Sequence, residues 1–457
     1  MKRLALLTAA ALAAGCSVGP NYTRPDVDLP ASLGVAQSPQ PPAERWWALF
    51  RDPVLERAID EALAHNRDLR AAAERVEQAR AQLGIARADQ RPDAGLEASR
   101  ARNRSSERGG FPLPPEAIET NSYRAVLRAS WELDFWGKYR RATEAARADL
   151  AASEAGREAV RASIVADVAR GYFALRALDR RLETLSRTLD GRRKALELQK
   201  LRFDAGVVSE LEYRQVESDL RTSEALVPTL RQLVTRQEGA LALLLGRSPR
   251  AILEAPVARG TPATPEVEVP AGLPSDLLLR RPDLRQAEAV LQSANARIGV
   301  ARAAYFPSIT LTGFFGSESQ SLGDLFSGPA RTWSLAGGLL QPLLSAGRIR
   351  SGVDLADARA REAAEGYQRA IANAFREVRD ALSVQGNARD AFHAQQERER
   401  ALARTLELSR LRYEAGAVSL FEVLETERQL LGARLEAIDA ERDRRNAIVD
   451  LYLALGA

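Results

Sequence analysis

The sequence repeats itself, and this duplication constrains the fold more than any other feature of the chain. Residues 68–96 match residues 283–311 at a constant shift of 215 positions, which keeps glycine, proline and aspartate in register. Residues 201–212 (LRFDAGVVSELE) match residues 411–422 (LRYEAGAVSLFE) at a shift of 210. Because a shared helix-favouring composition would not hold such residues at a fixed spacing, we predict an internally duplicated fold.

Proline placement predicts two very long helices. No proline lies between Pro115 and Pro228 or after Pro342, and helix-forming residues dominate both tracts. We therefore expect helices over about 138–203 and 348–413, each roughly 100 Å long at 1.5 Å per residue. A helix of this length cannot bury itself in a compact globule, so it must pack on other long helices.

The end of each long helix carries the signals of a tight hairpin. An Ala-Gly pair predicts a helix stop, because glycine readily adopts the left-handed conformation that ends a helix. A serine followed three residues later by glutamate then predicts a capping box that starts a returning helix. These boxes pair Ser209 with Glu212 and Ser419 with Glu422. The returning helices carry apolar residues at three- and four-residue steps, which is typical of coiled-coil-like packing.

Alternating apolar and polar residues predict strands outside the helices. The pattern is clearest in the segment SYRAVLRASWELDF, where a period of two indicates a strand with two unlike faces. Arg100 breaks the alternation of the first strand by falling in its apolar phase. The expected strands are about 94–104, 122–135, 308–318 and 331–342.

The lengths of these strands suit tilted membrane strands of about ten residues. An ordinary sheet with one wet face is the alternative that the pattern leaves open. Four strands cannot close a membrane barrel, since the minimum is about eight. If they span a membrane, several chains must therefore share one barrel.

The N-terminus predicts export and a lipid anchor. Lys2 and Arg3 precede an apolar stretch over residues 4–14 that is too short to span a bilayer, so residues 1–15 have the pattern of a signal peptide. A buried N-terminal helix is the alternative. Small residues lead up to Cys16, as at a lipoprotein cleavage site, and Cys16 is the only cysteine in the chain. We expect a covalent lipid there, which anchors a protein without spanning the membrane.

Charge and motifs exclude other function classes. The formal net charge is +4 without any basic block, so a nucleic-acid partner is not implied. After the signal peptide no segment has about eighteen continuous apolar residues, and we expect no later transmembrane helix. His65 and His393 are the only histidines, and no nucleotide-binding or nucleophile motif is present. We predict no metal site, no catalytic residues and no enzymatic activity.

Four segments carry a resemblance to a known family. They are CSVGPNYTRP (16–25), WWALFRDPVLERAIDEALAHNRDL (46–69), GLPSDLLLRRPDLRQAE (272–288) and ARAAYFPSITLTGFFG (301–316). With the duplicated AGxVS turns, the chain resembles the TolC-like outer-membrane factors, in the lipoprotein (NodT-like) branch that serves RND-type efflux pumps.

The resemblance implies a fold and an assembly. The fold class is mainly α with a small β part, with duplicated long helical hairpins. A homotrimer would form a twelve-helix α-barrel and a shared twelve-stranded membrane β-barrel with four strands from each protomer. Residues 30–60, residues 247–280 and the C-terminal end would form an equatorial collar.

The resemblance also implies location, partners and function. The protein would be anchored in the bacterial outer membrane by lipid, such as palmitate, on Cys16 and would extend into the periplasm. A periplasmic adaptor and an inner-membrane RND-type pump would be its partners. It would be a passive exit duct for drugs, metals or other small compounds, with no cofactor beyond that lipid.

The expected parts of the chain follow the repeats. They are a signal peptide (1–15), a lipidated arm and equatorial segment (16–65), a first repeat (66–246), an equatorial linker (247–280) and a second repeat (281–457).

The candidate site residues lie at the ends of the hairpins. By resemblance, the turns would contact the adaptor, through Gly206, Val207, Val208, Ser209, Gly416, Ala417, Val418 and Ser419. Carboxylates just after the turns, Glu422 and Glu425, occupy positions that line a narrow channel entrance in the family, with Glu212 at the corresponding place in the first repeat. Glutamate here replaces the aspartate that is common in the family.

Two other functions remain as alternatives. One is an outer-membrane duct for type I protein secretion. The other is a lipid-anchored helical scaffold that tethers envelope layers without a pore, although such a scaffold leaves the two matched strand pairs unexplained.

Overall fold

The computed structural model describes residues 17–27, 45–108, 114–265 and 281–456. The chain forms two compact units. The first comprises Met1–Asp26, Arg75–Glu154 and Gln286–Gln368, and the second comprises Val27–Glu74, Ala155–Arg285 and Arg369–Ala457. Each unit therefore contains segments from both sequence repeats.

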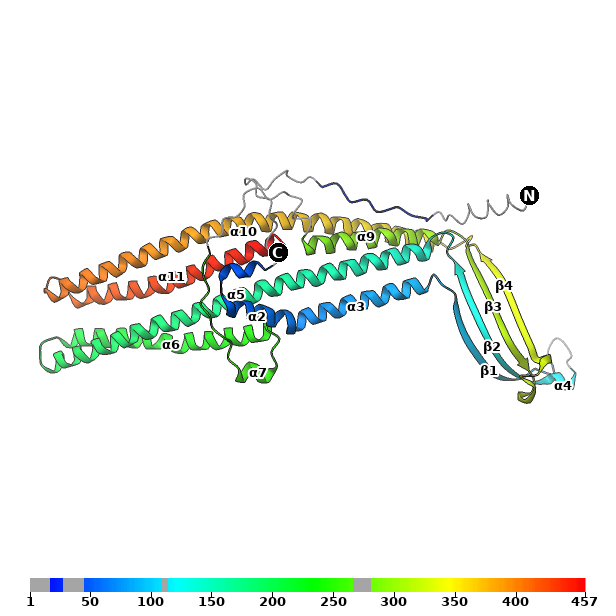
Figure 1. Cartoon of the computed structure of the whole chain (residues 1–457), viewed down its shortest axis with the longest axis horizontal. Coiled ribbons are helices and arrows are strands. Elements are labelled where there is room, and N and C mark those ends of the chain that lie inside the picture. Colours follow the sequence, from blue (N-terminus) through cyan, green and yellow to red (C-terminus); the bar gives the residue numbers. More distant parts are fainter. Residues whose placement is uncertain (1–16, 28–44, 109–113, 266–280, 457) are drawn as a thin grey trace. The chain divides into compact units, whose positions relative to one another are not determined.

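The first unit contains one antiparallel sheet in the order β1-β2-β3-β4 (Figure 1). The strands are β1 (Asp93–Arg104), β2 (Glu119–Leu133), β3 (Ser308–Ser319) and β4 (Arg331–Leu340), and the short helix α4 (Pro115–Ile118) precedes β2. The central pairing of β2 with β3 joins the two repeats in one sheet.

The second strand starts and ends earlier than its expected range of 122–135. It ends at Leu133 because the next residue, Asp134, serves the following helix. Its carboxylate accepts hydrogen bonds from the backbone N–H groups of Tyr139 and Arg140, at 3.1 and 2.8 Å. The chain thus changes from strand to helix at a carboxylate that satisfies first-turn donors of the helix.

Four helices pass from one unit to the other. They are α3 (Arg67–Ala88), α5 (Lys138–Asp204), α9 (Pro282–Ala303) and α10 (Arg348–Glu414). The two longest helices have 67 residues each, and their bounds agree with the predicted 138–203 and 348–413 within one residue. None of the helices in the described ranges combines the length and the apolar character that a membrane span needs.

An N-terminal strap over residues 17–26 lies against the helices of the first unit. The backbone N–H of Val18 donates to the carbonyl of Trp136 at 3.1 Å, and the Arg141 guanidinium donates to the carbonyls of Val18 and Gly19. Gly19 has a φ of +101°, and a Cβ there would meet the Gly299 Cα at 2.5 Å. Glycine at both positions lets the two backbones touch.

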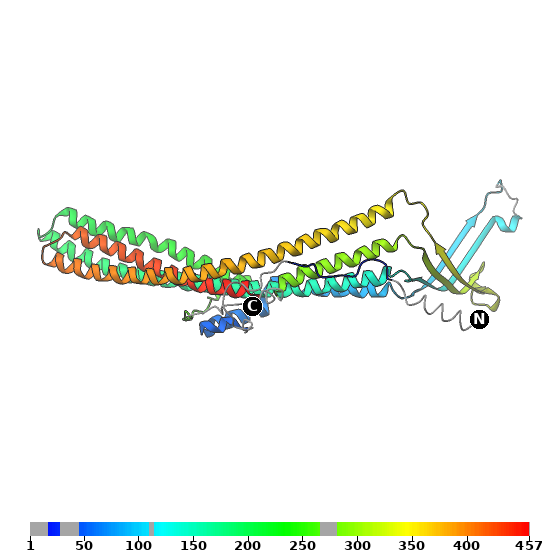
Figure 2. The same cartoon turned by 90° about the horizontal axis from the view of Figure 1, so that it is seen from above.

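Two helical hairpins lie side by side in the second unit (Figures 1 and 2). One joins α5 to α6 (Glu210–Leu244), and the other joins α10 to α11 (Leu420–Ala454). Leu431 of α11 packs with Leu185 and Leu220 of the first hairpin in one apolar cluster. Burial of leucines from both hairpins supplies the packing that such long helices require.

Segments far apart in the sequence share the largest core of the second unit. Its members come from η1 (Trp46–Phe50), α2 (Pro53–His65), the middle of α5 and the C-terminal ends of α6 and α11, together with Val257. Trp46 stacks on Tyr452 with the ring centroids 5.3 Å apart. The short helix α7 (Pro249–Glu254) and the segment after it also belong to this unit.

A buried carboxylate fixes this core at one point. Asp52 caps α2 by accepting from the backbone of Val54, and it also accepts from the Tyr172 hydroxyl at 2.7 Å. The same hydroxyl oxygen accepts from the backbone N–H of Gly260 at 2.8 Å. These bonds satisfy Asp52, which is only 1% exposed, and they tie residue 260 to α5.

Candidate functional site

The two hairpin turns have the same backbone geometry. In the first, the N–H of Val207 donates to the carbonyl of Arg202 and the N–H of Gly206 donates to that of Phe203, at 2.8 and 2.9 Å. The second turn repeats both bonds at the equivalent positions with the same distances. Gly206 and Gly416 have φ values of +70° and +73°, so each helix ends in a glycine-dependent Schellman motif.

The two returning helices begin differently, which corrects one prediction. Ser209 and Glu212 form the predicted capping box, in which each side chain bonds to the other residue's backbone N–H. Ser419 makes no capping bond with its side chain. Glu422 lies 3.8 Å from the Arg412 guanidinium instead, and its backbone N–H donates to the Ser419 carbonyl. The arginine in the preceding helix thus draws the carboxylate away from the cap.

The predicted entrance carboxylates all have partners within the chain. Glu425 accepts from Gln429 and Arg428, and these bonds hold the pKa of its carboxyl below the ordinary value of 4.5. Glu422 and Glu425 lie one turn apart on α11, whereas Glu212 lies on α6 in the other hairpin. The structure thus brings two of the three together.

A buried ion pair lies between α5 and α6, farther along the first hairpin from its turn. Arg192 Nη2 is 2.9 Å from Asp219 Oδ2, and the two side chains are only 6% and 5% exposed. Arg192 also donates to the Asp219 carbonyl and to the Ser223 hydroxyl. Burial raises the pKa of Asp219, although the positive charges of Arg192 and Arg428 oppose this effect.

One arginine connects this pair to the entrance carboxylates. Arg428 Nη1 lies 4.0 Å from Asp219 Oδ1, and Arg428 Nη2 forms an ion pair with Glu425. Asp219 belongs to the first hairpin and Arg428 to the second. The two hairpins are therefore joined by a charge network that includes a predicted entrance residue.

In the first unit, one face of the sheet is apolar and exposed. Leu96, Leu127, Phe315 and Trp333 lie opposite one another in register and form a row across all four strands. Leu96 is 80% and Trp333 is 73% exposed. Such a row of large apolar side chains on a surface marks a contact with lipid or with another protein.

The opposite face of the sheet is polar. Arg128 lies 3.5 Å from Glu97, and Arg124 lies 4.0 Å from Glu318. The guanidinium of Arg124 also lies over the Phe314 ring at 4.5 Å. One apolar and one charged face follow from the alternation that predicted these strands.

Both outer strands of this sheet have an open edge. In the described part of the chain, β1 pairs with β2 alone and β4 pairs with β3 alone. Each outer strand therefore presents a row of unpaired backbone donors and acceptors, which is a template for another strand.

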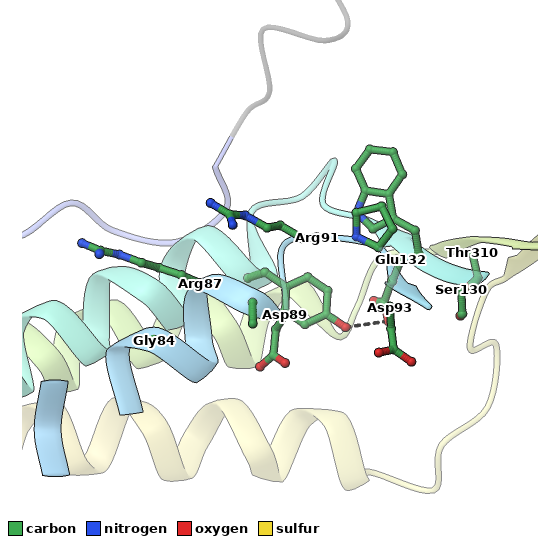
Figure 3. Close-up of a pocket in the computed structure, with 12 residues that line it drawn as sticks. Gly84, Arg87, Asp89, Arg91, Asp93, Ser130, Glu132 and Thr310 are labelled. Carbon is green, nitrogen blue, oxygen red and sulfur yellow. Dashed lines mark hydrogen bonds between the residues drawn. The ribbon is translucent and has the colours of Figure 1, made fainter. Parts of the chain in front are cut away.

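A hollow of about 720 Å³ lies where α3 passes into β1 (Figure 3). Arg87 and Arg91 point away from Asp89 and Asp93, and Glu132 accepts a hydrogen bond from a tyrosine in the wall. The charges of the two signs do not converge on one point. No group of three potential metal ligands occurs among the described residues.

One protein-family model decides the family. The model described as "Outer membrane efflux protein" matches residues 58–247 and 273–457. The chain belongs to the outer membrane efflux protein family. Both matched ranges contain one helical hairpin and one pair of strands, so the family's fold accounts for the duplication.

Known efflux proteins match nearly the whole chain. The cation efflux system protein CusC of Escherichia coli K12 is 33% identical over 448 residues, which are 97% of this chain and 96% of that protein. The probable outer membrane lipoprotein SilC of Salmonella typhimurium is 33% identical and covers 100% of this chain and 98% of its own. The structure of the Campylobacter jejuni CmeC outer membrane channel superposes with a TM-score of 0.92 at 30% identity, covering 96% and 95% of the two chains.

These matches confirm the predicted family, fold class, outer-membrane location and efflux-channel function. The family is one of transport ducts. The predicted lipidation site, Cys16, lies outside the described residues.

Sequence reasoning missed Arg192, Asp219 and Arg428 in this efflux channel. A signal for one of them is present, because Asp219 lies at a helical spacing between the buried residues Val216 and Ser223 on α6. A charged residue in the buried phase of a helix indicates a buried partner. No comparable local signal identifies that partner.

Proposed function

We propose that the chain is the outer-membrane exit duct of a tripartite efflux system and works as a homotrimer. Three copies would contribute four strands each to one membrane barrel, and their hairpins would surround a periplasmic tunnel. Drugs, metal ions or other small compounds would pass outward through it. Transport would be passive, since an inner-membrane RND-type pump would supply the energy.

The open-edged sheet with one apolar face carries this proposal. A four-stranded sheet is too small to close on itself, whereas membrane strands must have every backbone group paired. Pairing the free edge of β1 with that of β4 in another copy satisfies both edges. The exposed row from Leu96 to Trp333 would then face lipid.

The hairpin turns fit the role of adaptor contacts. Val207, beside the left-handed Gly206, is 70% exposed, so an apolar side chain projects from the turn. The equivalent turn at residues 416–419 has the same backbone. We propose that the turn residues Gly206–Ser209 and Gly416–Ser419 bind the periplasmic adaptor.

Carboxylates beside these turns fit the role of the channel entrance. Three copies of Glu422 and Glu425, together with Glu212 of the first hairpin, would place a ring of negative charge around the opening, and such rings attract cations. Arg412 and Arg428 lie against two of these carboxylates. They would reduce the repulsion that a closed ring has to overcome.

The N-terminal strap supports lipid attachment at Cys16. Ser17 lies against Gly137, and Val18 bonds to Trp136, in the short link from β2 to α5. A lipid on the preceding residue would therefore emerge at the end of the sheet that meets α3 and α5, which is the periplasmic side of the membrane in such a duct. We retain the expected division of the chain into a signal peptide (1–15), an arm (16–65), two repeats and a linker (247–280).

Conductance of the purified full chain in planar bilayers tests the proposal, with its mass measured in parallel. We expect a trimer whose current is small in the wild type and rises in Glu422→Ala/Glu425→Ala, because that variant removes the carboxylates from the narrow entrance. The control is Glu436→Ala, an exposed carboxylate on α11 that pairs with Arg398 away from the turn, and it should conduct like the wild type.

One outcome would reject the duct, and another would reject only the role of the carboxylates. A monomeric protein that gives no current, even as the double variant, would favour the tethering scaffold. A trimer whose current is the same in wild type, control and double variant would leave the duct in place but remove the entrance role from these carboxylates.

A further inference from the structure

Three arginines interrupt the apolar face of the sheet at one end of β1. Arg100, Arg102 and Arg104 occupy alternate positions and therefore point to the same side as Leu96. All three are exposed. We call Arg100, Arg102 and Arg104 the arginine stripe.

The stripe lies at the end of the sheet that is farther from helices α3 and α5. Helix α3 leads into β1 at Asp93, and β2 leaves toward α5 at Leu133, whereas Arg104 and Glu119 face the connection between the two strands (Figure 1). In an outer-membrane channel whose helices extend into the periplasm, this end lies at the outer surface of the membrane.

The register gives the height of the stripe. Arg100 opposes Tyr123, which is eight residues from Trp131 on β2, or about 27 Å along the strand at 3.4 Å per residue. A strand tilted by about 40° would cover roughly 20 Å of membrane thickness over that length, against a lipid-facing apolar band of about 25 Å. The outer edge of the band therefore falls within the stripe.

Arginine on the lipid-facing side is costly in the middle of a membrane and nearly neutral at its surface. The stripe thus occupies the level at which phosphate groups of membrane lipids lie. A planar guanidinium binds phosphate with two parallel hydrogen bonds, so this position matches the chemistry of arginine to that of the headgroup.

The stripe keeps an excess of positive charge. Glu119 accepts from Arg102 at 2.7 Å and from Arg104 at 2.9 Å, and Arg104 also bonds to Glu107 at 3.1 Å. Among the described residues, the recorded contact of the Arg100 guanidinium is with the Tyr123 ring, at 5.5 Å. The N–H groups of the Arg100 guanidinium are thus available to another acceptor, while the contact with the Tyr123 ring holds the side chain in place.

A fourth arginine extends the positive charge to the other edge of the sheet. Arg331 begins β4 on the same face as Trp333, and it is exposed. On this face of the strand ends, the guanidinium groups of Arg100, Arg102, Arg104 and Arg331 share the surface with the carboxylate of Glu119. An anionic surface complements such a patch.

We propose that the arginine stripe binds the phosphate groups of the phosphorylated glycolipid in the outer leaflet of the outer membrane. Arg100 would make the main contact, and Arg102 and Arg104 would hold the phosphate while sharing Glu119. The inference rests on the proposed function in one respect, since it requires the apolar face of the sheet to lie against lipid.

Native mass spectrometry of the full chain in detergent tests this site. The probe is a hexa-acylated glycolipid with two phosphates, and the comparison is the same glycolipid with its phosphates removed. We expect the wild type to bind the phosphorylated form about tenfold more tightly, since each arginine near an anionic surface contributes several-fold. The variant Arg100→Gln/Arg102→Gln/Arg104→Gln should bind both forms equally.

The opposite face of the same sheet supplies the matched control. Arg124→Gln/Arg128→Gln removes two arginines from the polar face and should keep the wild-type preference. Should the triple variant fail to assemble, the single change Arg100→Gln, which leaves the bonds to Glu119 intact, should still reduce the preference about threefold.

Conductance measured on the same samples separates the two proposals. Suppose that the triple variant, or the single variant in its place, conducts as a trimer and still prefers the phosphorylated glycolipid as strongly as the wild type. This result would refute phosphate binding by the arginine stripe and leave the duct intact. Phosphate binding by the stripe is also refuted if the wild type binds both glycolipids equally. It is refuted as well if the control variant loses as much of the preference for the phosphorylated form as the triple variant does. A protein that is monomeric and gives no current, also as Glu422→Ala/Glu425→Ala, would refute the duct itself.

Discussion

Replacing one member of the buried pair between α5 and α6 should loosen the first hairpin, whereas replacing both should not. The variants are Asp219→Leu, Arg192→Met and the double change. Asp219→Leu leaves the Arg192 guanidinium almost fully buried without its counter-ion, since that side chain is 6% exposed. The double change removes both charges and fills the space with apolar side chains of similar volume.

The size of the effect follows from burial and geometry. Removing one partner of a buried ion pair costs about 3–5 kcal/mol, and replacing both is close to neutral. We expect a cost at the lower end of this range, about 3 kcal/mol. The reason is that the Arg192 Nη2 and Asp219 Oδ2 atoms approach to 2.9 Å without hydrogen-bond geometry. A cost of about 3 kcal/mol corresponds to opening that is roughly 100-fold more frequent.

Hydrogen–deuterium exchange of the full chain in detergent measures this opening. Amides of residues 210–230 should exchange roughly 100-fold faster in each single variant and at nearly the wild-type rate in the double variant. Arg221→Met provides the control, because Arg221 lies on the same helix with an exposed side chain that pairs with Glu224. It should leave the exchange rate unchanged.

Equal exchange in the single and double variants would refute the reasoning. It would mean that the apolar contacts of the hairpin outweigh the pair and that the buried charges are solvated. Acceleration in the control as large as that in Asp219→Leu would point to a general loss of helix stability instead.

Four other substitutions test particular contacts. Ser209→Ala should lower the stability of α6 by about 1 kcal/mol and speed hydrogen–deuterium exchange at its start. Ser419→Ala should have neither effect on α11, because Ser209 caps its helix with its side chain and Ser419 does not. Gly299→Ala should expose the strap to protease, since a Cβ there would lie 2.7 Å from a strap carbonyl. A hydrogen bond from Arg259 holds the pKa of Glu238 below 4.5, so Glu238 stabilises its contacts above that pH and loses this effect as the pH falls through the lowered pKa. Exchange of residues 255–265, corrected for intrinsic rates, should therefore rise on acidification in the wild type but not in Glu238→Gln.

The helical part of the fold could be predicted closely because its signals are local. The Ala-Gly pairs set the ends of the long helices, and glycine at Gly206 and Gly416 adopts the left-handed conformation that the prediction required. Strand existence was equally visible from alternation. The ends of the strands were harder to predict. The end of β2 depends on hydrogen bonds between the Asp134 side chain and the backbone of α5, the helix that follows.

The contacts between elements could not be predicted from local patterns. The failure of Ser419 to form a capping box depends on Arg412, which lies on the other helix of the hairpin. The partner of Asp219 is 27 positions earlier in the chain, on a helix with many exposed arginines. A single sequence does not show which of these arginines is buried. It also does not show in which register β2 pairs with β3.

The division of the molecule into two units has a consequence for making chimeras of efflux channels. The chain passes between the units five times, and four of these passages fall within helices α3, α5, α9 and α10. Domain boundaries usually lie in exposed linkers, where a foreign segment can be joined without disturbing a helix. Neither unit here can be cut out at such linkers. A graft should therefore exchange a whole hairpin with its strand pair, and the natural joint is the segment between Leu244 and Pro282, where the two repeats meet.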